Sequence, residues 1–160
     1  MAVINMSEAG IAEALALAEA TPQRLAASSA GRDDTHLSEP PAPGEWSPLE
    51  ILNHLRACEE VWMHSVHTML AHHNPRLQET HPRQWIKTAT PYTAQPFTKG
   101  LRVFTLRREA LLITLRGLST TDWARECRIK QKTHTVFSHV WRMVQHEHIH
   151  CAEIEAILRS

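Results

Sequence analysis

Residues 146–150 read HEHIH and place two histidines four residues apart. Side chains four apart on a helix are neighbours, about 6 Å from each other, so His146 and His150 can both reach one ion at a Zn–N distance of roughly 2.0–2.1 Å. The same letters satisfy H-E-x-x-H, in which the glutamate is the general base of a zinc protease. The segment therefore raises two hypotheses, a protease helix and one half of a different metal site.

A protease of this type needs a third ligand downstream of the second histidine. No H-x-x-G-x-x-H continuation follows His150, and Glu153 and Glu155 are too close along the same helix to serve as that distant ligand. We therefore do not expect a protease.

Glu147 falls within the apolar sector of the helix predicted at 135–158. A buried carboxylate is costly unless it is paired or hydrogen-bonded. Its candidate roles are a hydrogen-bond acceptor behind a metal ligand, a catalytic general base for metal-bound water, or the partner of an arginine such as Arg142 or Arg107 in a core salt bridge.

The missing third ligand is predicted to be His54, on the flank of the apolar face of a second predicted helix. His54 lies about 9 Å from the start of that helix, and the midpoint of His146 and His150 lies about 15 Å before the end of the last helix. If the two helices run antiparallel, these distances place His54 and the pair His146 and His150 at nearly the same level along the bundle axis. The three imidazoles can then meet.

Apolar residues recur at helical spacing in four segments, 7–30, 47–73, 96–118 and 135–158, which predicts an all-α four-helix bundle in a single domain, 1–160. Thr21-Pro22 should kink or restart the first helix, since proline removes a donor and clashes with the preceding turn. The second helix begins with SPLE, in which Ser47 fits the N-cap, Pro48 the first helical position and Glu50 the capping-box acid. The proline-containing loop 74–95 is long enough to cross the bundle, so that the second and third helices lie parallel.

The composition excludes several classes of protein. Seventeen basic and seventeen acidic residues give a net charge of zero, so no electrostatic footprint for nucleic acid or an anionic membrane is present. Three cysteines without a C-x-x-C motif favour a reducing, cytoplasmic location over a disulfide framework. No signal peptide and no run of roughly 20 apolar residues is recognised.

Four further residues are candidates for the surroundings of the site. Cys58 is one helical turn from His54, so it is a small core residue or an alternative ligand. His139 and Arg142 precede the HEHIH histidines and could line a pocket. Trp85, in the long loop, could cover a substrate cleft.

The chain resembles the DinB/YfiT-like superfamily of helical-bundle metalloproteins. The resemblance rests on TPQRL (21–25), PGEWSPLEILNHL (43–55), RREALLITLRGLSTTDW (107–123) and HEHIH. It implies an up-down-down-up bundle with a long crossover between helices 2 and 3, and a divalent metal (zinc, nickel, iron or manganese) held by His54, His146 and His150. It also implies a homodimer. After the last ligand the family often shows a basic residue, a glycine and a glutamine, whereas this chain has Cys151, Ala152 and Glu153.

Relatives of known activity look like transferases and isomerases that use a low-molecular-weight thiol, or metal-dependent hydrolases. The resemblance thus favours a metal-dependent enzyme, a hydrolase or thiol S-transferase acting on a small-molecule substrate. The alternative is a non-catalytic, metal-stabilised protein with a stress-related binding or scaffold role. The enzyme predicts an open coordination position in a pocket, and the alternative predicts a fourth ligand such as Cys58 or Glu147 and a loss of folding on chelation.

Overall fold

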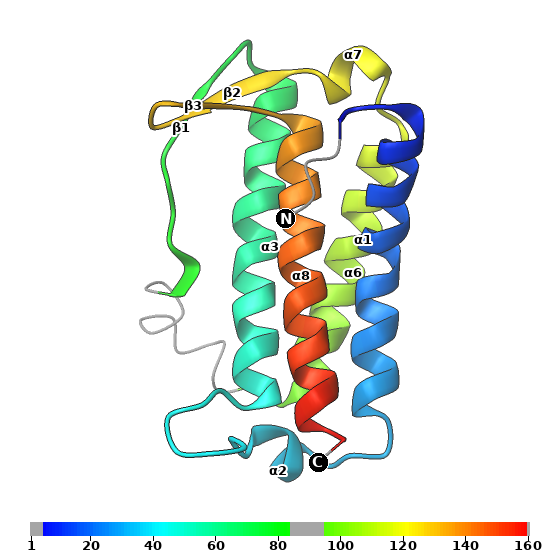
Figure 1. Cartoon of the computed structure of the whole chain (residues 1–160), viewed down its shortest axis with the longest axis vertical. Helices are drawn as coiled ribbons and strands as arrows, with labels where there is room; N and C mark the ends of the chain where they lie inside the picture. The colour runs from blue at the N-terminus through cyan, green and yellow to red at the C-terminus, as the bar shows by residue number, and fades with distance from the viewer. Residues whose placement is uncertain (1–4, 84–94, 160) are drawn as a thin grey trace.

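The computed structural model describes residues 5–83 and 95–159. Four long helices, α1 (Glu8–Ser29), α3 (Pro48–Ala71), α6 (Phe97–Arg116) and α8 (Val136–Ile157), lie side by side in a bundle (Figure 1). The helices α3 and α6 run in one direction and α1 and α8 in the other (Figure 1). Helix α8 packs against α1 and α3, and α6 packs against the same two helices. The predicted four-helix bundle with parallel second and third helices is confirmed.

Side-chain caps define where α1, α3 and α8 begin. Ser47 accepts a hydrogen bond from the backbone N–H of Glu50, while the Glu50 carboxylate accepts one from the Ser47 N–H, as SPLE predicts. Thr135 and Ser138 form the same reciprocal arrangement at the start of α8. Such caps satisfy amide groups that have no partner within the helix. They set where α3 and α8, which carry His54, His146 and His150, begin along the chain.

Helix α1 continues through Pro22 instead of restarting there. Proline has no N–H, so the carbonyl of Ala18, four residues earlier, loses its helical donor. The Arg108 guanidinium of α6 donates to that carbonyl at 2.9 Å. A side chain from a neighbouring helix thus replaces the missing hydrogen bond, which the sequence of α1 alone cannot reveal.

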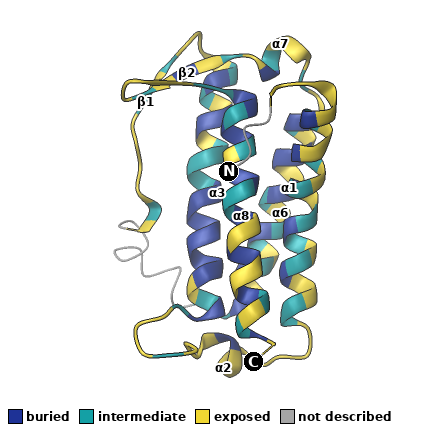
Figure 2. Ribbon diagram, in the orientation of Figure 1, coloured by how far each residue is buried: buried dark blue, intermediate teal, exposed yellow. Residues whose placement is uncertain are grey.

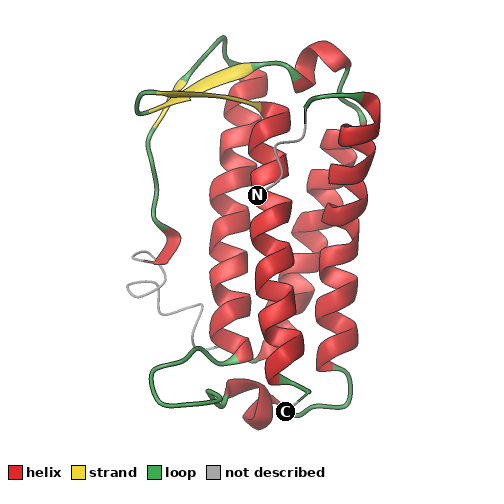
Figure 3. Cartoon of the chain, viewed as in Figure 1, coloured by secondary structure: helices red, strands yellow, loops and turns green. Residues whose placement is uncertain are grey.

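Short elements that the sequence pattern did not predict close the two ends of the bundle (Figure 3). Helix α2 (Asp34–Ser38) lies at one end, and α7 (Thr120–Trp123) lies at the other with a small sheet. The sheet has the order β1-β2-β3, with β1 (Arg76–Leu77) parallel to β2 (Glu126–Ile129) and β2 antiparallel to β3 (Lys132–Thr135). The expected loop 74–95 therefore contains a strand, and the all-α prediction omits this minor sheet. Thr135 ends β3 and caps α8, so the sheet determines where α8 starts.

The buried apolar residues form two clusters stacked along the bundle. On each helix a polar residue separates them: Thr21 on α1, Glu59 on α3, Arg108 on α6 and Glu147 on α8. Helix α3, which carries His54, is buried along much of its length (Figure 2). No described helix combines the length and the apolar character that crossing a membrane requires.

Candidate metal centre

His54 projects from the second turn of α3 and is 4% exposed. The Trp46 ring lies beside it, with ring centroids 5.2 Å apart. Burial, and to a smaller extent His146, His150 and Arg83, lower the pKa of His54 to about 3. The imidazole is therefore neutral at pH 7, which is the state in which a histidine can bind a metal.

The two histidines of α8 face His54 across the helix pair. The Nε2 atom of His146 lies 3.1 Å from that of His54 and 3.2 Å from that of His150. The centroids of the His54 and His150 rings are 4.9 Å apart. Two nitrogens bound to one tetrahedral ion at 2.0–2.1 Å lie roughly 3.3 Å from each other. The observed separations match that requirement, so the structure brings together the three histidines that the sequence named.

Charge and hydrogen bonding prepare the two α8 histidines for a cation. Burial, then His150 and Arg83, lower the pKa of His146 to about 4, so this ring is also neutral at pH 7. The Nδ1 atom of His150 lies 2.6 Å from a carboxylate oxygen of Glu153. A carboxylate only accepts, so Nδ1 carries a proton in this hydrogen bond, and Nε2 is the nitrogen that lies toward His146. We did not predict this role for Glu153 from the sequence, although its i,i+3 spacing from His150 was visible there.

Cys58 forms a second donor set with two of the same histidines. One donor atom each of His54, Cys58 and His146 lie within 4.8 Å of one another. The Cys58 sulfur is 3.7 Å from Nδ1 of His54 and 3.6 Å from its Nε2. A sulfur almost equidistant from both ring nitrogens lies beside the ring and not beyond the Nε2 lone pair, where a shared ion would sit. Burial raises the pKa of the Cys58 thiol to about 12, so the thiol is protonated at pH 7.

A cavity of about 360 Å³ opens beside His54 and His146. Three residues that the sequence associated with a pocket, Cys58, His139 and Arg142, line it. His150 instead lines a neighbouring hollow with Trp46 and Glu153, and Arg83 borders both spaces. Trp85 lies outside the described residues.

Two tryptophans flank the histidine cluster. The Trp46 ring is near His54 and His150, and the Trp62 ring is 5.2 Å from that of His146. The Arg83 guanidinium carbon lies 4.6 Å above the Trp46 ring. We did not assign Trp46, Trp62 or Arg83 to the site from the sequence, because an aromatic residue near a helix start or on an apolar face is more often a packing residue.

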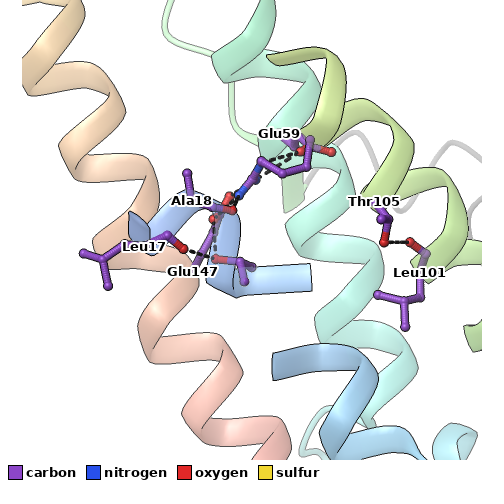
Figure 4. A network of polar contacts seen from close by, with 8 residues as sticks. Leu17, Ala18, Glu59, Leu101, Thr105 and Glu147 are labelled. Carbon is purple, nitrogen blue, oxygen red and sulfur yellow. Dashed lines mark hydrogen bonds and ion pairs between the residues drawn. The ribbon is translucent and has the colours of Figure 1, made fainter. Parts of the chain in front are cut away.

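Glu147 lies in the polar layer of the core. Its two carboxylate oxygens accept hydrogen bonds from Arg108 at 2.9 and 2.6 Å, and one of them also accepts from the Thr21 hydroxyl at 3.1 Å. Arg108 also donates to Glu59 and to the Ala18 carbonyl, so these groups and Glu147 lie in one network of hydrogen bonds (Figure 4). Successive side chains on a helix are turned by about 100°, so Glu147 is directed away from the neighbouring His146.

The two arginines named from the sequence as partners of Glu147 are both wrong. Arg107 pairs with Glu60, and Arg142 lines the cavity. The partner is Arg108, which is 1% exposed. Sequence periodicity shows that an arginine is on α6, but not which of two adjacent arginines enters the core.

The polar layer has two carboxylates for one arginine, which explains a raised pKa at Glu59. Arg108 contacts both Glu59 and Glu147. Burial, opposed by Arg108, raises the pKa of Glu59 to about 8. One arginine cannot neutralise two buried carboxylates, so Glu59 holds a proton at pH 7. The contacts of this layer favour a salt-bridge role for Glu147.

Comparison with known proteins supports the fold and the family. The chain matches the DinB superfamily over residues 17–154, and no curated protein compared with it matches. Among solved structures it is similar to YfiT from Bacillus subtilis, with a TM-score of 0.87, 19% sequence identity, and coverage of 99% of this chain and 91% of that one. YfiT is described as a probable metal-dependent hydrolase with an unusual four-helix bundle topology. The chain thus belongs to the DinB superfamily.

Proposed function

We propose that the chain is a metal-dependent hydrolase of a small-molecule substrate, with His54, His146 and His150 as the metal ligands. The observation that carries the proposal is the convergence of three imidazole nitrogens from two helices, at successive separations of 3.1 and 3.2 Å. The description of YfiT as a probable metal-dependent hydrolase supports the same reaction class.

The residues present suit a divalent cation. Three imidazole ligands accommodate zinc, nickel, iron or manganese. Held by three protein ligands, a zinc ion would have an open position and would lower the pKa of a water bound there to about 7. Because His54 and His146 line the cavity, a substrate would approach from that side.

The remaining side chains act on the ligands and on access. Glu153 fixes the tautomer and orientation of His150 through its hydrogen bond to Nδ1. Trp46 and Trp62 pack against the imidazoles of His54 and His146 and limit how far these rings can move. Glu147 has no catalytic role in this proposal, because Arg108 and Thr21 already occupy its oxygens.

We favour His150 over Cys58 as the third ligand. The His150 nitrogen faces that of His146, whereas the Cys58 sulfur lies beside the His54 ring.

A non-catalytic, metal-stabilised scaffold remains the second candidate, and it requires a fourth ligand that closes the site. The salt bridge of Glu147 to Arg108 argues against Glu147 in that role, which leaves Cys58. A Cys58→Ala variant therefore separates the candidates. It should keep its metal and its activity in the hydrolase and lose metal in the scaffold.

The test combines metal analysis with activity assays on the purified, untagged chain. The parent protein and Cys58→Ala should carry one divalent ion per chain, and His54→Ala, His146→Ala and His150→Ala should each lose most of it. The metal-loaded parent is then assayed against ester and amide panels, and against electrophiles with low-molecular-weight thiols. Equal metal content in parent and His54→Ala would remove the proposed centre. Conjugation of thiols without hydrolysis would replace hydrolase by thiol S-transferase.

A further inference from the structure

His139 of α8 is a buried polar residue that the proposed reaction does not use. It is 4% exposed, and neither of its ring nitrogens has a hydrogen-bond partner among the described residues. A buried donor without a partner costs folding free energy, and so such a group calls for an explanation. His139 lines the same cavity as His54 and His146. A bound ligand would supply the partner that the described residues do not.

Arg142 places a positive charge in the same wall. It is exposed to the cavity side and forms no ion pair or hydrogen bond with a described residue. Glu79 is the one acidic residue among the described residues lining the cavity, and it already pairs with Lys130 and His81. Arg83 adds a second positive charge at the border. Among its described residues, the cavity therefore carries cationic charge without a matching carboxylate.

The protonation state of His139 fits a role as hydrogen-bond donor. Burial, then His134 and Arg142, lower the pKa of His139 to about 4, so its ring is neutral at pH 7. A neutral imidazole has one N–H to donate and one nitrogen that accepts. Beside the guanidinium of Arg142, this is a pair of donors for one anionic group.

We propose that the end of the cavity nearer the start of α8 binds an anionic group of the substrate, a carboxylate or a phosphate, with Arg142 as its counterion and His139 as a hydrogen-bond donor. The inference rests on the proposed function, because it names the substrate class of that same site. Along the helix, Arg142 lies about 6 Å before His146, and His139 lies about 10 Å before His146. The substrate is then a small ester or amide whose anionic group lies roughly 6–10 Å from the bond that is cleaved.

Binding of dicarboxylates to the zinc-loaded full chain tests this arrangement without any need for turnover. A series from succinate to suberate is titrated by calorimetry, next to phosphonocarboxylates of matching length. One end mimics the reaction product at the metal, and the other reaches Arg142. Affinity should pass through a maximum with chain length, and the preferred series identifies the anion as carboxylate or phosphate.

The decisive variants are Arg142→Gln and the matched control Arg102→Gln, an exposed arginine of α6 without a described ion pair. We expect Arg142→Gln to weaken binding of the best probe about tenfold or more, because a charge-assisted contact is lost. Arg102→Gln should bind as the parent does. Equal affinity in the two variants, or an affinity independent of chain length, would overturn the inference.

His139→Phe separates ligand binding from packing. The phenyl ring fills similar space and removes both unpaired nitrogens, so the thermal midpoint should stay equal or rise while affinity for the probe falls severalfold. A lower midpoint with unchanged affinity would show that His139 serves packing alone, and would remove it from the inference.

Hydrolysis assays distinguish this inference from the proposed function. Arg142-dependent binding without hydrolysis of any substrate would support the anion site and contradict the hydrolase. Hydrolysis of neutral and carboxylate-bearing esters with equal kcat/KM, unchanged in Arg142→Gln, would support the hydrolase and contradict the anion site.

Discussion

The hydrogen bond between Glu153 and His150 is the contact through which a residue outside the ligand set tunes the proposed centre. A carboxylate on the far nitrogen of a ligating histidine raises its basicity and fixes its orientation. We predict that Glu153→Gln lowers zinc affinity about 10- to 100-fold while the fold is kept. Competition with a chromophoric chelator measures the affinity.

Glu155→Gln is the matched control for that measurement. Glu155 lies on the same helix but pairs with Arg24, away from the histidines. Its removal should leave zinc affinity unchanged. If both variants lose affinity equally, the effect comes from net charge and not from the orientation of His150.

His139 also gives the metal-free protein a dependence of stability on pH. Its pKa is lowered from 6.5 to about 4 on folding, so between these values the unfolded chain binds more protons than the native one. Stability is therefore full above about pH 6.5 and is lost as the pH falls toward 4. The contribution is at most roughly 3 kcal/mol at pH 7.

Denaturant unfolding of the metal-free parent and His139→Phe at pH 7 and at pH 5 measures this contribution. The parent should lose more stability on acidification than the variant does, since the other buried histidines are common to both. An identical loss in the two proteins would contradict the lowered pKa of His139.

At the scale of the elements, Arg108 is the residue that connects all four long helices. From α6 it reaches the Ala18 carbonyl of α1, Glu59 of α3 and Glu147 of α8. Its removal would leave a buried carboxylate without its counterion and the Ala18 carbonyl without a donor. We predict that Arg108→Met destabilises the protein by about 3–5 kcal/mol in chemical denaturation.

The surface pair of Arg116 and Glu19 provides the comparison, because both side chains are 51% exposed. Arg116→Gln should cost no more than about 1 kcal/mol. Adding Glu147→Gln to Arg108→Met should restore part of the loss, since the unpaired charge is then gone. A loss below about 1 kcal/mol for Arg108→Met would mean that water reaches the polar layer and replaces the arginine.

At the scale of the whole molecule, we predict that the bundle keeps its fold without a metal. Two buried clusters extend along the helices, and the histidine cluster lies at the side of one helix pair. We predict that chelation of the metal-loaded protein lowers the thermal midpoint, because an ion that binds only the native state stabilises it. The far-UV circular dichroism should nevertheless remain that of a helical protein.

A collapse of helical signal on chelation would contradict that expectation. It would favour the metal-stabilised scaffold, in which binding free energy is folding free energy. Chelated His54→Ala serves as the control for effects of the chelator itself. The homodimer stays a prediction, which sedimentation of the parent protein can check.

The sequence by itself determined the limits and directions of the long helices, and it predicted that His54, His146 and His150 lie together. Apolar spacing and local caps, such as Ser47 with Glu50, act within a few residues, so these helix limits agree with the prediction to within about two residues. The spacing of His146 and His150 is likewise a local property of one helix. The position of His54 along the bundle axis, level with the α8 histidines, followed from the rise per residue of a helix once the crossover made α3 and α8 antiparallel.

Only the tertiary structure decided which side chains meet. Arg108 rather than Arg107 pairs with Glu147, and α1 passes through Pro22 because that same arginine supplies the missing donor. The short strands depend equally on their neighbours, since each is stable only when paired. Such contacts join residues far apart in sequence, so no local pattern records them. The sequence also does not reveal that the His139 nitrogens are buried without a hydrogen-bond partner among the described residues, because burial is a property of the packed molecule.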